Sequence, residues 1–402
     1  MRLRDLRIET FKSFEDETIP LEPISFLVGP NGSGKTSVLQ AIEFFGALTR
    51  GTLKEELDAR EFEYRDLPWL RGERQQFGFT ASLEWRESLL EWLLRFGARR
   101  NPGVHTERVA LNGEELMYRR ERSMWRLDRS SESKEEVRQT LTSSWLAAIE
   151  DIPGHGATRA QKTGREEDEC RFPELVSVAD WAKGIGRYVT LDPAVLRRPS
   201  RRTSEGLGPR GEDLAGFLRW LRDERGPRFE AMLERVKERY EPLQGLELKT
   251  AGYGWFRVSV EEHWGRGTVR LLAPQVSDGL LRLIAISAMH ELPKPPSIVM
   301  IDEIENGLHP HLVGHVVEML EELAEETEIQ VVATSHSPIA LNYVAHPSHV
   351  LVAHRDRQGR SRVRRLDETP GFRRIGRQLD PGELWYNLGE AGLFRRRRSP
   401  RR

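Results

Sequence analysis

The sequence predicts an α/β fold in which helices cover a mostly parallel sheet, with an antiparallel β lobe and an inserted helical lid. Near the N-terminus, an apolar strand over 24–28 leads into a glycine-rich turn and then into a helix over 36–48. That order is typical of the first strand–helix unit of a parallel sheet. The last third alternates regularly, with helices expected at 279–290, 310–325 and 338–344 and strands at 297–301, 329–333 and 349–353.

The region between these two parts follows other patterns. Residues 77–85 and 107–127 alternate apolar and polar side chains, and Asn112-Gly113 is a hairpin-turn signal, so we expect an antiparallel lobe. Residues 129–170 are polar and charged, and we interpret them as a mobile insertion with one helical patch around Trp145. We also expect strands at 1–9 and 188–191, a loop at 199–212, two helices between 213 and 240 that divide near Gly226-Pro227, and short strands at 254–261 and 267–272.

The length of 402 residues allows two to three domains, or one large domain with insertions. By motif and composition we expect four segments. These are an N-terminal lobe at 1–128, a helical insertion or lid at 129–245, a C-terminal lobe at 246–390 and an arginine-rich tail at 391–402.

The composition excludes several classes of protein. The 62 basic and 63 acidic side chains nearly cancel, which argues against a surface coated with positive charge for nucleic acid. The single cysteine, Cys170, excludes a disulfide framework and a multi-cysteine zinc site. No signal peptide is visible, and no apolar stretch approaches the roughly 20 residues of a membrane span. We therefore expect a cytoplasmic protein that is not in a membrane.

The glycine-rich turn is the strongest chemical signal. Residues 29–36 match the pattern G-x-x-x-x-G-K-S/T, whose backbone N–H groups can surround phosphates. Lys35 would contact the β- and γ-phosphates of ATP, and the Thr36 hydroxyl would hold Mg²⁺. A plain glycine-rich turn is the alternative, but the position between a strand and a helix favours phosphate binding. The candidate ATP-binding residues here are Gly29, Pro30, Asn31, Gly32, Ser33, Gly34, Lys35, Thr36 and Ser37.

Two carboxylates follow the apolar strand at 297–301. The carboxyl ends of parallel strands are where ligands bind in such sheets, so Asp302 and Glu303 are placed for catalysis. Asp302 would hold Mg²⁺, directly or through water, and Glu303 would act as general base on the attacking water. A strand that ends in a solvated acidic turn is the alternative.

Two more motifs accompany these carboxylates. His336 follows the next strand at the same edge of the sheet, where it can bond the γ-phosphate or the attacking water; a capping serine beside a satisfied histidine is the alternative. Ser277, Asp278 and Gly279 open a helix, and the free N–H groups of a helix start form an anion site. Because the phosphate loop already has its own helix start, this second site suits a nucleotide bound by another subunit; plain capping is the alternative.

In this order the four elements resemble the head of an ABC-type ATPase, a P-loop NTPase. They are more similar to the RecF, SMC and OLD-like AAA-family ATPases than to transporter ATPases. By this resemblance Gly29–Thr36 corresponds to Walker A, Ile298–Glu303 to Walker B with its catalytic Glu303, Ser277–Gly279 to the signature motif, and His336 to the switch histidine. Glu305–Pro310 resembles the D-loop region of the OLD-like branch, and Ile8–Phe14 resembles the start of these heads. The Q-loop glutamine is not assigned.

The resemblance implies a catalytic cycle and a partner. Two heads, in a homodimer or a higher homo-oligomer, would enclose two ATP molecules, each closed by the other subunit's Ser277 loop, and Glu303 would drive hydrolysis. It also implies work on DNA or control of a nuclease, as in antiphage defence or repair. Only 66 residues follow His336, without an acidic cluster after a strand. We therefore expect a separate effector subunit, a nuclease or a toxin, rather than a nuclease in the same chain.

Three other functions are alternatives to this one. A RecF/SMC-like repair ATPase that binds DNA directly is the main alternative, although the near-neutral charge speaks mildly against it. A transporter ATPase would need a membrane subunit and a clear Q-loop. A non-enzymatic scaffold would have lost Lys35, Asp302 or Glu303, and all three are present.

Three weaker signals have plain explanations. His309, His311 and His315 include an i,i+4 pair with metal-ligand spacing, but solvated histidines are the favoured interpretation. The arginines of the tail favour a solubilising segment over a contact to a phosphate backbone or an acidic partner. The same interpretation applies to a second arginine cluster, formed by Arg197, Arg198, Arg201 and Arg202.

Overall fold

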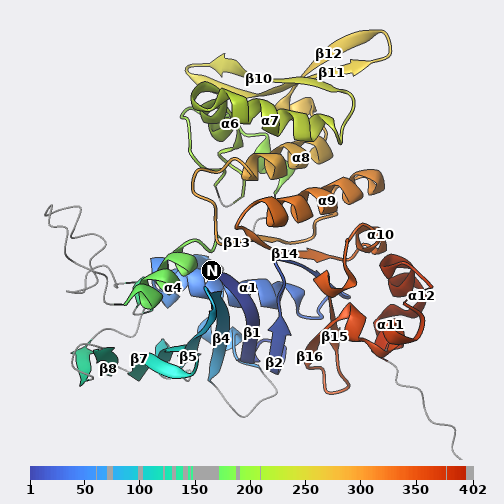
Figure 1. Cartoon of the computed structure of the whole chain (residues 1–402). Helices are drawn as coiled ribbons and strands as arrows, with labels where there is room; N and C mark the ends of the chain where they lie inside the picture. The colour runs from blue at the N-terminus through green and yellow to red at the C-terminus, as the bar shows by residue number, and fades with distance from the viewer. Residues whose placement is uncertain are drawn as a thin grey trace, which may run out of the picture. The chain divides into compact units, whose positions relative to one another are not determined.

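The computed structural model divides the chain into two compact units (Figure 1). Unit 1 comprises Met1–Glu22, Val28–Gly186 and Leu351–Leu366, and unit 2 comprises Pro23–Leu27, Arg187–Val350 and Asp367–Arg402. The residues that the structure describes are 1–59, 61–69, 76–97, 103–120, 123–128, 133–138, 144, 146–147, 172–186, 191–208, 210–376 and 378–394.

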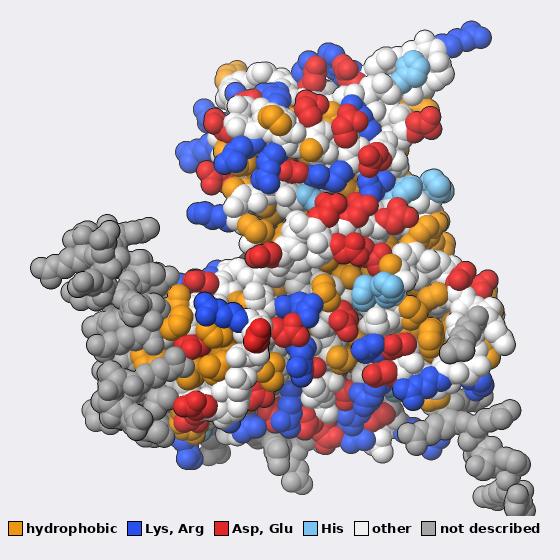
Figure 2. Space-filling model, in the orientation of Figure 1, with side chains coloured by type: hydrophobic (Ala, Val, Ile, Leu, Met, Phe, Trp, Pro, Cys, Tyr) orange, Lys and Arg blue, Asp and Glu red, His pale blue; other side chains and the backbone are white. Residues whose placement is uncertain are grey.

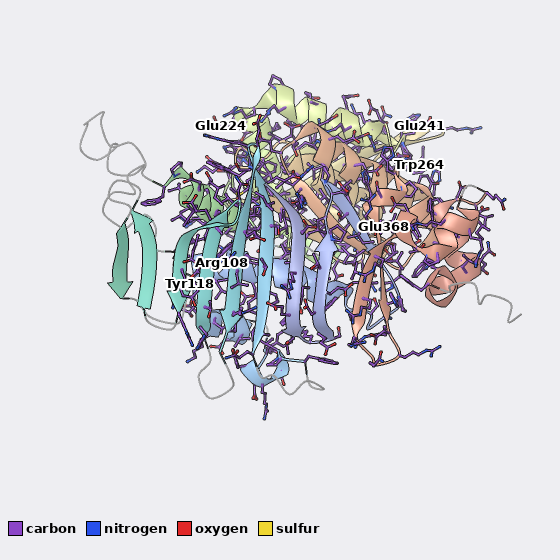
Figure 3. The ribbon with its side chains drawn as sticks, turned by 60° about the horizontal axis from the view of Figure 1, so that its bottom comes forward. Arg108, Tyr118, Glu224, Glu241, Trp264 and Glu368 are labelled. Carbon is purple, nitrogen blue, oxygen red and sulfur yellow. The ribbon has the colours of Figure 1, made fainter. Side chains whose placement is uncertain are left out.

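Unit 1 contains an antiparallel eight-stranded sheet with the order β2-β1-β4-β5-β6-β7-β8-β9. Figure 3 shows these strands side by side, with Arg108 of β6 next to its register partner Tyr118 of β7. The strands are β1 (Arg2–Phe11), β2 (Phe14–Pro20), β4 (Phe77–Trp85), β5 (Ser88–Phe96), β6 (Val104–Leu111), β7 (Glu114–Arg120), β8 (Ser123–Asp128) and β9 (Ser133–Arg138). The predicted strand at 77–85 and the hairpin at Asn112-Gly113 are confirmed.

An aromatic cluster fixes α1 (Lys35–Arg50) to this sheet. Phe44 of α1 lies 5.4 Å from Phe79 and 5.8 Å from Phe96, measured between ring centroids, and Phe77 stacks on Phe96 at 4.5 Å. Burying each of these rings stabilises the fold by roughly 1.5–3 kcal/mol. The cluster therefore holds α1, and with it the loop that precedes α1, in a defined place. The other helical elements of unit 1 are α2 (Leu53–Ala59), η1 (Tyr64–Asp66) and α4 (Pro173–Lys183).

A hairpin from late in the chain completes unit 1. β15 (Val350–Arg355) pairs antiparallel with β16 (Ser361–Arg365). The Ser361 N–H donates to the Ser13 carbonyl at 2.8 Å, next to the start of β2. Residues separated by almost the whole sequence are thus neighbours in this unit.

Unit 2 has the predicted alternation of strands and helices. β13 (Ile298–Ile301) and β14 (Gln330–Ser335) pair in parallel, and the Val331 N–H donates to the Pro23 carbonyl just before β3 (Ile24–Val28). Within unit 2, β14 lies between β13 and β3. The helical elements are α5 (Pro193–Leu196), α6 (Leu214–Glu224), α7 (Gly226–Lys237), η3 (Ala273–Gln275), α8 (Asp278–Met289), α9 (Pro310–Glu326), α10 (Pro338–Asn342), η4 (Pro347–His349), η5 (Leu366–Glu368, whose first residue belongs to unit 1), α11 (Pro370–Ile375) and α12 (Pro381–Phe394).

A three-stranded antiparallel sheet of unit 2 packs on α6 and α7 (Figure 1). Its strands are β10 (Leu243–Gly252), β11 (Trp255–Trp264) and β12 (Gly267–Leu272). The predicted division between α6 and α7 at Gly226-Pro227 is confirmed, because Arg225 leaves helical geometry and Pro227 sits in the first turn of α7. Within the described ranges, no helix combines the length and apolar character needed to cross a bilayer.

Several sequence predictions need correction or lie outside the described residues. β2, β5, β10 and β16 were not predicted, and β9 lies in the segment that we interpreted as a mobile insertion. The predicted strand at 188–191 fails at Leu191, which is in no strand. Residues 188–190, Trp145, Cys170 and 395–402 of the tail lie outside the described residues, while α12 includes 391–394. The four segments predicted from motif and composition stay a prediction.

Candidate functional site

The phosphate-loop candidate lies in unit 1, between β3 and α1. The Lys35 ammonium is buried and donates to the carbonyls of Gly29 at 2.8 Å and Pro30 at 3.1 Å. The Ser33 hydroxyl is also buried, and it has no hydrogen-bond partner in the part of the chain that the structure describes. A cation and an unsatisfied hydroxyl inside a glycine-rich loop fit a triphosphate, whose oxygens can accept from both.

Close contacts explain two of the loop glycines. A Cβ on Gly29 would lie 2.3 Å from the Ala353 carbonyl oxygen of β15. Gly34 has a φ of 109°, in the region that favours glycine, and a Cβ there would lie 2.6 Å from the Ser361 hydroxyl. The loop can adopt this path only because both residues lack a side chain.

The β15–β16 hairpin supports the loop through hydrogen bonds to loop carbonyls, a contact that the sequence did not reveal. Ser361 donates through its hydroxyl to the Ser33 carbonyl at 2.6 Å, and the same hydroxyl lies 2.7 Å from that of Ser13. Arg355 donates through Nε to the Gly32 carbonyl at 2.7 Å. The loop backbone is therefore fixed at two successive carbonyls before any ligand is present.

The candidate acidic residues lie in unit 2, where the register of two strands brings them to a threonine. Ile301 of β13 pairs with Ala333 of β14, so Asp302 and Thr334 are the next residues along each strand. The fully buried Thr334 hydroxyl donates to Asp302 Oδ1 at 2.5 Å and accepts from the Glu303 N–H at 2.8 Å. Thr334 thus fixes both carboxylate-bearing residues, a role that the sequence analysis missed.

Glu303 has a strained backbone beside the candidate switch histidine. Its φ of 52° is left-handed, which costs a residue with a Cβ about 1–2 kcal/mol. His336 lies with Nε2 3.6 Å from Glu303 Oε1, and its backbone N–H donates to the Glu305 carboxylate. The structure therefore brings Asp302, Glu303 and His336 together, as their positions at the ends of neighbouring strands predicted.

The Ser277 loop lies against the segment that follows these carboxylates. Ser277 is exposed and caps α8 by accepting the Leu280 N–H at 3.3 Å. A Cβ on Gly279 would lie 2.4 Å from Leu312 Cδ1, and one on Gly307 would lie 3.6 Å from Asp278 Oδ2. The loop and residues 307–312 are consequently one packed cluster within unit 2.

The histidines near α9 form no metal cluster. The rings of His311 and His315 are 5.5 Å apart, and His315 Nδ1 lies 3.3 Å from Glu318 Oε2. Over the described ranges of the chain, no group of three His, Cys, Asp or Glu side chains could hold a metal ion. A Mg²⁺ ion needs no such cluster, because it takes most of its ligands from phosphate and water oxygens.

Replacing Thr334 tests the buried contact directly. We expect Thr334→Val to lower the free energy of unfolding by about 1–3 kcal/mol, because it leaves the Glu303 N–H and an Asp302 oxygen without this hydroxyl. The matched control is Thr49→Val, where the buried hydroxyl bonds the Gly46 and Phe45 carbonyls inside its own helix α1, and about 0.5 kcal/mol is expected. Urea denaturation measures both. Equal losses of unfolding free energy in the two variants would show that the Thr334 hydroxyl contributes no more than an ordinary buried hydroxyl.

Two family models match the chain. One, described as "AAA domain, putative AbiEii toxin, Type IV TA system", matches residues 189–342. The other, described as "AAA ATPase domain", matches residues 1–67. The matched ranges contain the phosphate loop, the Ser277 loop, both carboxylates and His336.

Curated relatives match over short stretches. The chain is 46% identical over 41 residues to an OLD nuclease of Thermus scotoductus, which is 10% of this chain and 8% of that protein. It is 48% identical over 54 residues to the DNA replication and repair protein RecF of Chlorobium luteolum, 13% of this chain and 14% of that protein. RecF of Shewanella woodyi is 32% identical over 117 residues, 29% of this chain and 28% of that protein. The matches thus span less than a third of these relatives' lengths.

Solved structures are similar over most of the chain. The SMC head bound to the C-winged helix domain of ScpA gives a TM-score of 0.53 at 15% identity, covering 90% of this chain and 98% of that one. An SMC head bound to the C-terminal domain of ScpA, from Pyrococcus furiosus, gives 0.51 at 14% identity, covering 90% and 96%. These likenesses confirm the predicted α/β P-loop ATPase fold.

Proposed function

We propose that this chain belongs with the RecF-, SMC- and OLD-like AAA ATPases, as its motifs predict, and that it hydrolyses ATP to ADP and phosphate with Mg²⁺. The observation that carries the proposal is the network in unit 2 in which Thr334 bonds both Asp302 and Glu303, and in which His336 lies beside Glu303. A turn with a purely structural role would require neither a buried hydroxyl that bonds two acidic residues nor a left-handed backbone at the second of these residues.

We assign phosphate binding to residues 29–37. Lys35 exchanges its two carbonyl partners for β- and γ-phosphate oxygens, and the N–H groups at the start of α1 complete the anion site. Thr36 and Asp302 are the residues that hold Mg²⁺, which supplies positive charge to the phosphates when bound. The buried Ser33 hydroxyl supports this assignment, because a phosphate oxygen gives it a partner.

We assign hydrolysis to Glu303 and His336. Glu303 takes a proton from the attacking water as general base. Its carboxylate is exposed, and its backbone, with φ 52°, no longer continues the extended strand. His336 orients the same water or bonds the γ-phosphate. The backbone bond from His336 to Glu305 keeps the ring beside Glu303.

The Ser277 loop is assigned to the nucleotide of a second copy of this chain. Its support is the exposed Ser277 at the start of α8, because the N-terminal end of a helix favours an anion. Two heads therefore enclose two ATP molecules, and hydrolysis releases them. A homodimer is the simplest assembly with this geometry.

The biological partner is proposed to be a separate nuclease or toxin effector in DNA-related defence. The name of the family model at 189–342 and the OLD nuclease match support it, while the RecF matches support the alternative equally well. That alternative is a repair ATPase that binds DNA directly. Figure 2 shows basic and acidic side chains interspersed on the face in view, rather than one positive surface. Fluorescence anisotropy of labelled DNA, with and without ATP, distinguishes the two, because only the alternative requires ATP-dependent binding by the chain alone.

Lys35→Ala tests the phosphate site. We expect ATP affinity to fall about 100-fold or more, because two charge-assisted hydrogen bonds of roughly 1.5–3 kcal/mol each are lost. Isothermal titration with ATP and Mg²⁺ measures this. Lys54→Ala is the control, because it removes an exposed lysine of nearby α2. Wild-type affinity in Lys35→Ala would contradict the site.

A further inference from the structure

Arg197 contacts the Ser277 loop of its own chain. It follows α5, and its Nε donates to the Ala273 carbonyl at 3.1 Å. Its Nη2 donates to the Val276 carbonyl at 2.8 Å and forms an ion pair with the Asp278 carboxylate. One guanidinium therefore holds both sides of Ser277. The contact joins residues up to 81 positions apart, so it depends on the fold and not on local sequence.

The capping and packing of α5 hold the backbone from which the Arg197 side chain extends. Asp192 caps the helix by accepting the Ala194 N–H at 2.9 Å, and Leu196 is buried directly before Arg197. The Arg197 side chain is only 23% exposed. It is held in place rather than extended into solvent, unlike the solvated cluster that the sequence suggested for Arg197, Arg198, Arg201 and Arg202.

Asp278 creates an electrostatic problem for a loop that approaches a nucleotide. Its carboxylate is 43% exposed and sits beside Ser277, where an uncompensated negative charge repels a γ-phosphate. The start of α8 stabilises Asp278 within its own chain, but that same positive helix end is needed for the phosphate. The loop can serve a nucleotide only if the Asp278 charge is balanced.

A second cation near Asp278, Arg282, interacts with several carboxylates. Arg282 of α8 is buried and donates to the Leu191 carbonyl at 3.2 Å, and three carboxylates act on it: Asp278, Asp192 and Glu305. Burial lowers the pKa of Arg282, and these carboxylates oppose that shift. Asp192 already has an ion pair with Arg210, but Asp278 and Glu305 both act on Arg282, whereas Arg197 forms its ion pair with Asp278.

We propose that Arg197 is a positioning residue that neutralises Asp278 and fixes the Ser277 loop, so that the loop can close on the nucleotide of a second subunit. This role rests on the proposed ATP-driven dimer. A purely structural role, in which Arg197 only holds the two carbonyls, makes a different forecast. The charge of Asp278 matters in the first case and not in the second.

A double-mutant cycle separates these roles. Arg197→Gln is expected to slow phosphate release and weaken ATP-dependent dimerisation by about tenfold or more, with unchanged ATP affinity of the monomer. In the Asp278→Asn background the same Arg197→Gln change should cost much less, because no charge remains to neutralise. Arg197→Lys, which keeps the charge, should retain most activity. The matched control is Arg210→Gln, because Arg210 is an exposed arginine that pairs with Asp192 on the same α5 cap.

Each outcome decides the matter. An equal loss from Arg197→Gln in both backgrounds overturns the charge role, and a wild-type rate for Arg197→Gln overturns any role. Thermal unfolding checks that the variants fold; if Arg197→Gln does not, the comparison of Arg197→Lys with wild type decides, and a tenfold loss there counts against neutralisation. Absence of ATP binding or phosphate release in the wild type overturns the proposed function itself, which the same assays reveal separately.

Discussion

Glu303→Gln is expected to retain ATP binding but to lose turnover, so that ATP-bound dimers accumulate. The amide keeps the size of the side chain and tolerates the same backbone, but it cannot take a proton from the attacking water. General-base catalysis contributes about 10²–10⁴-fold to a rate, and a loss of that size is expected here. The phosphate loop is untouched, so affinity should stay near that of the wild type.

Three measurements check this expectation. Phosphate release gives the rate, isothermal titration gives the affinity, and size-exclusion chromatography with multi-angle scattering gives the mass with and without ATP. Glu328→Gln is the matched control, because Glu328 is an exposed carboxylate before β14. Hydrolysis at the wild-type rate by Glu303→Gln would refute the general-base role.

Ser277→Arg should block hydrolysis without weakening ATP binding to the monomer, and mixing it with Lys35→Ala should restore activity. A bulky cation at Ser277 fills the space where the second head closes. In a mixed dimer, the site with intact Lys35 faces the intact Ser277 of the other chain, while the second site has both defects. If one whole site suffices, each mixed dimer regains up to about half of the wild-type rate, and coupling between sites lowers that figure.

A titration of mixing ratios measures this recovery by phosphate release, with subunit exchange confirmed by labelled chains. Each variant mixed with itself is the control and should stay inactive. If Ser277 instead acts on the nucleotide of its own chain, neither variant has a whole site. A flat baseline at every ratio would then count against the shared dimer.

Local patterns explain why much of unit 2 was predictable. β13, α9 and β14 are continuous runs with one periodicity each, and their order along the chain defines the sheet edge. Asp302, Glu303 and His336 could be placed together because they follow neighbouring parallel strands. The same logic could have found Thr334, since the residues after two paired strands are themselves neighbours.

The missed elements depend on pairing that the sequence does not express. β5 reads SLLEWLLRF, an apolar run that suits a helix or a strand, and only the pairing with β4 and β6 decides. β9 reads SKEEVR, with little strand propensity, and exists because β8 offers it an edge. The contacts of Arg197 and Ser361 were equally invisible, because each joins residues far apart in the chain.

The support of the phosphate loop by Ser361 has a consequence for biosynthesis. Ser361 lies 328 residues after Ser33, and 348 after Ser13. At about 5–20 residues per second, a ribosome needs roughly 15–65 s to travel from the loop to its support. Pairings of such sequence separation also close slowly after release. The nascent loop therefore lacks two of its backbone anchors during synthesis, and it reaches its final support only when β15 and β16 have been made.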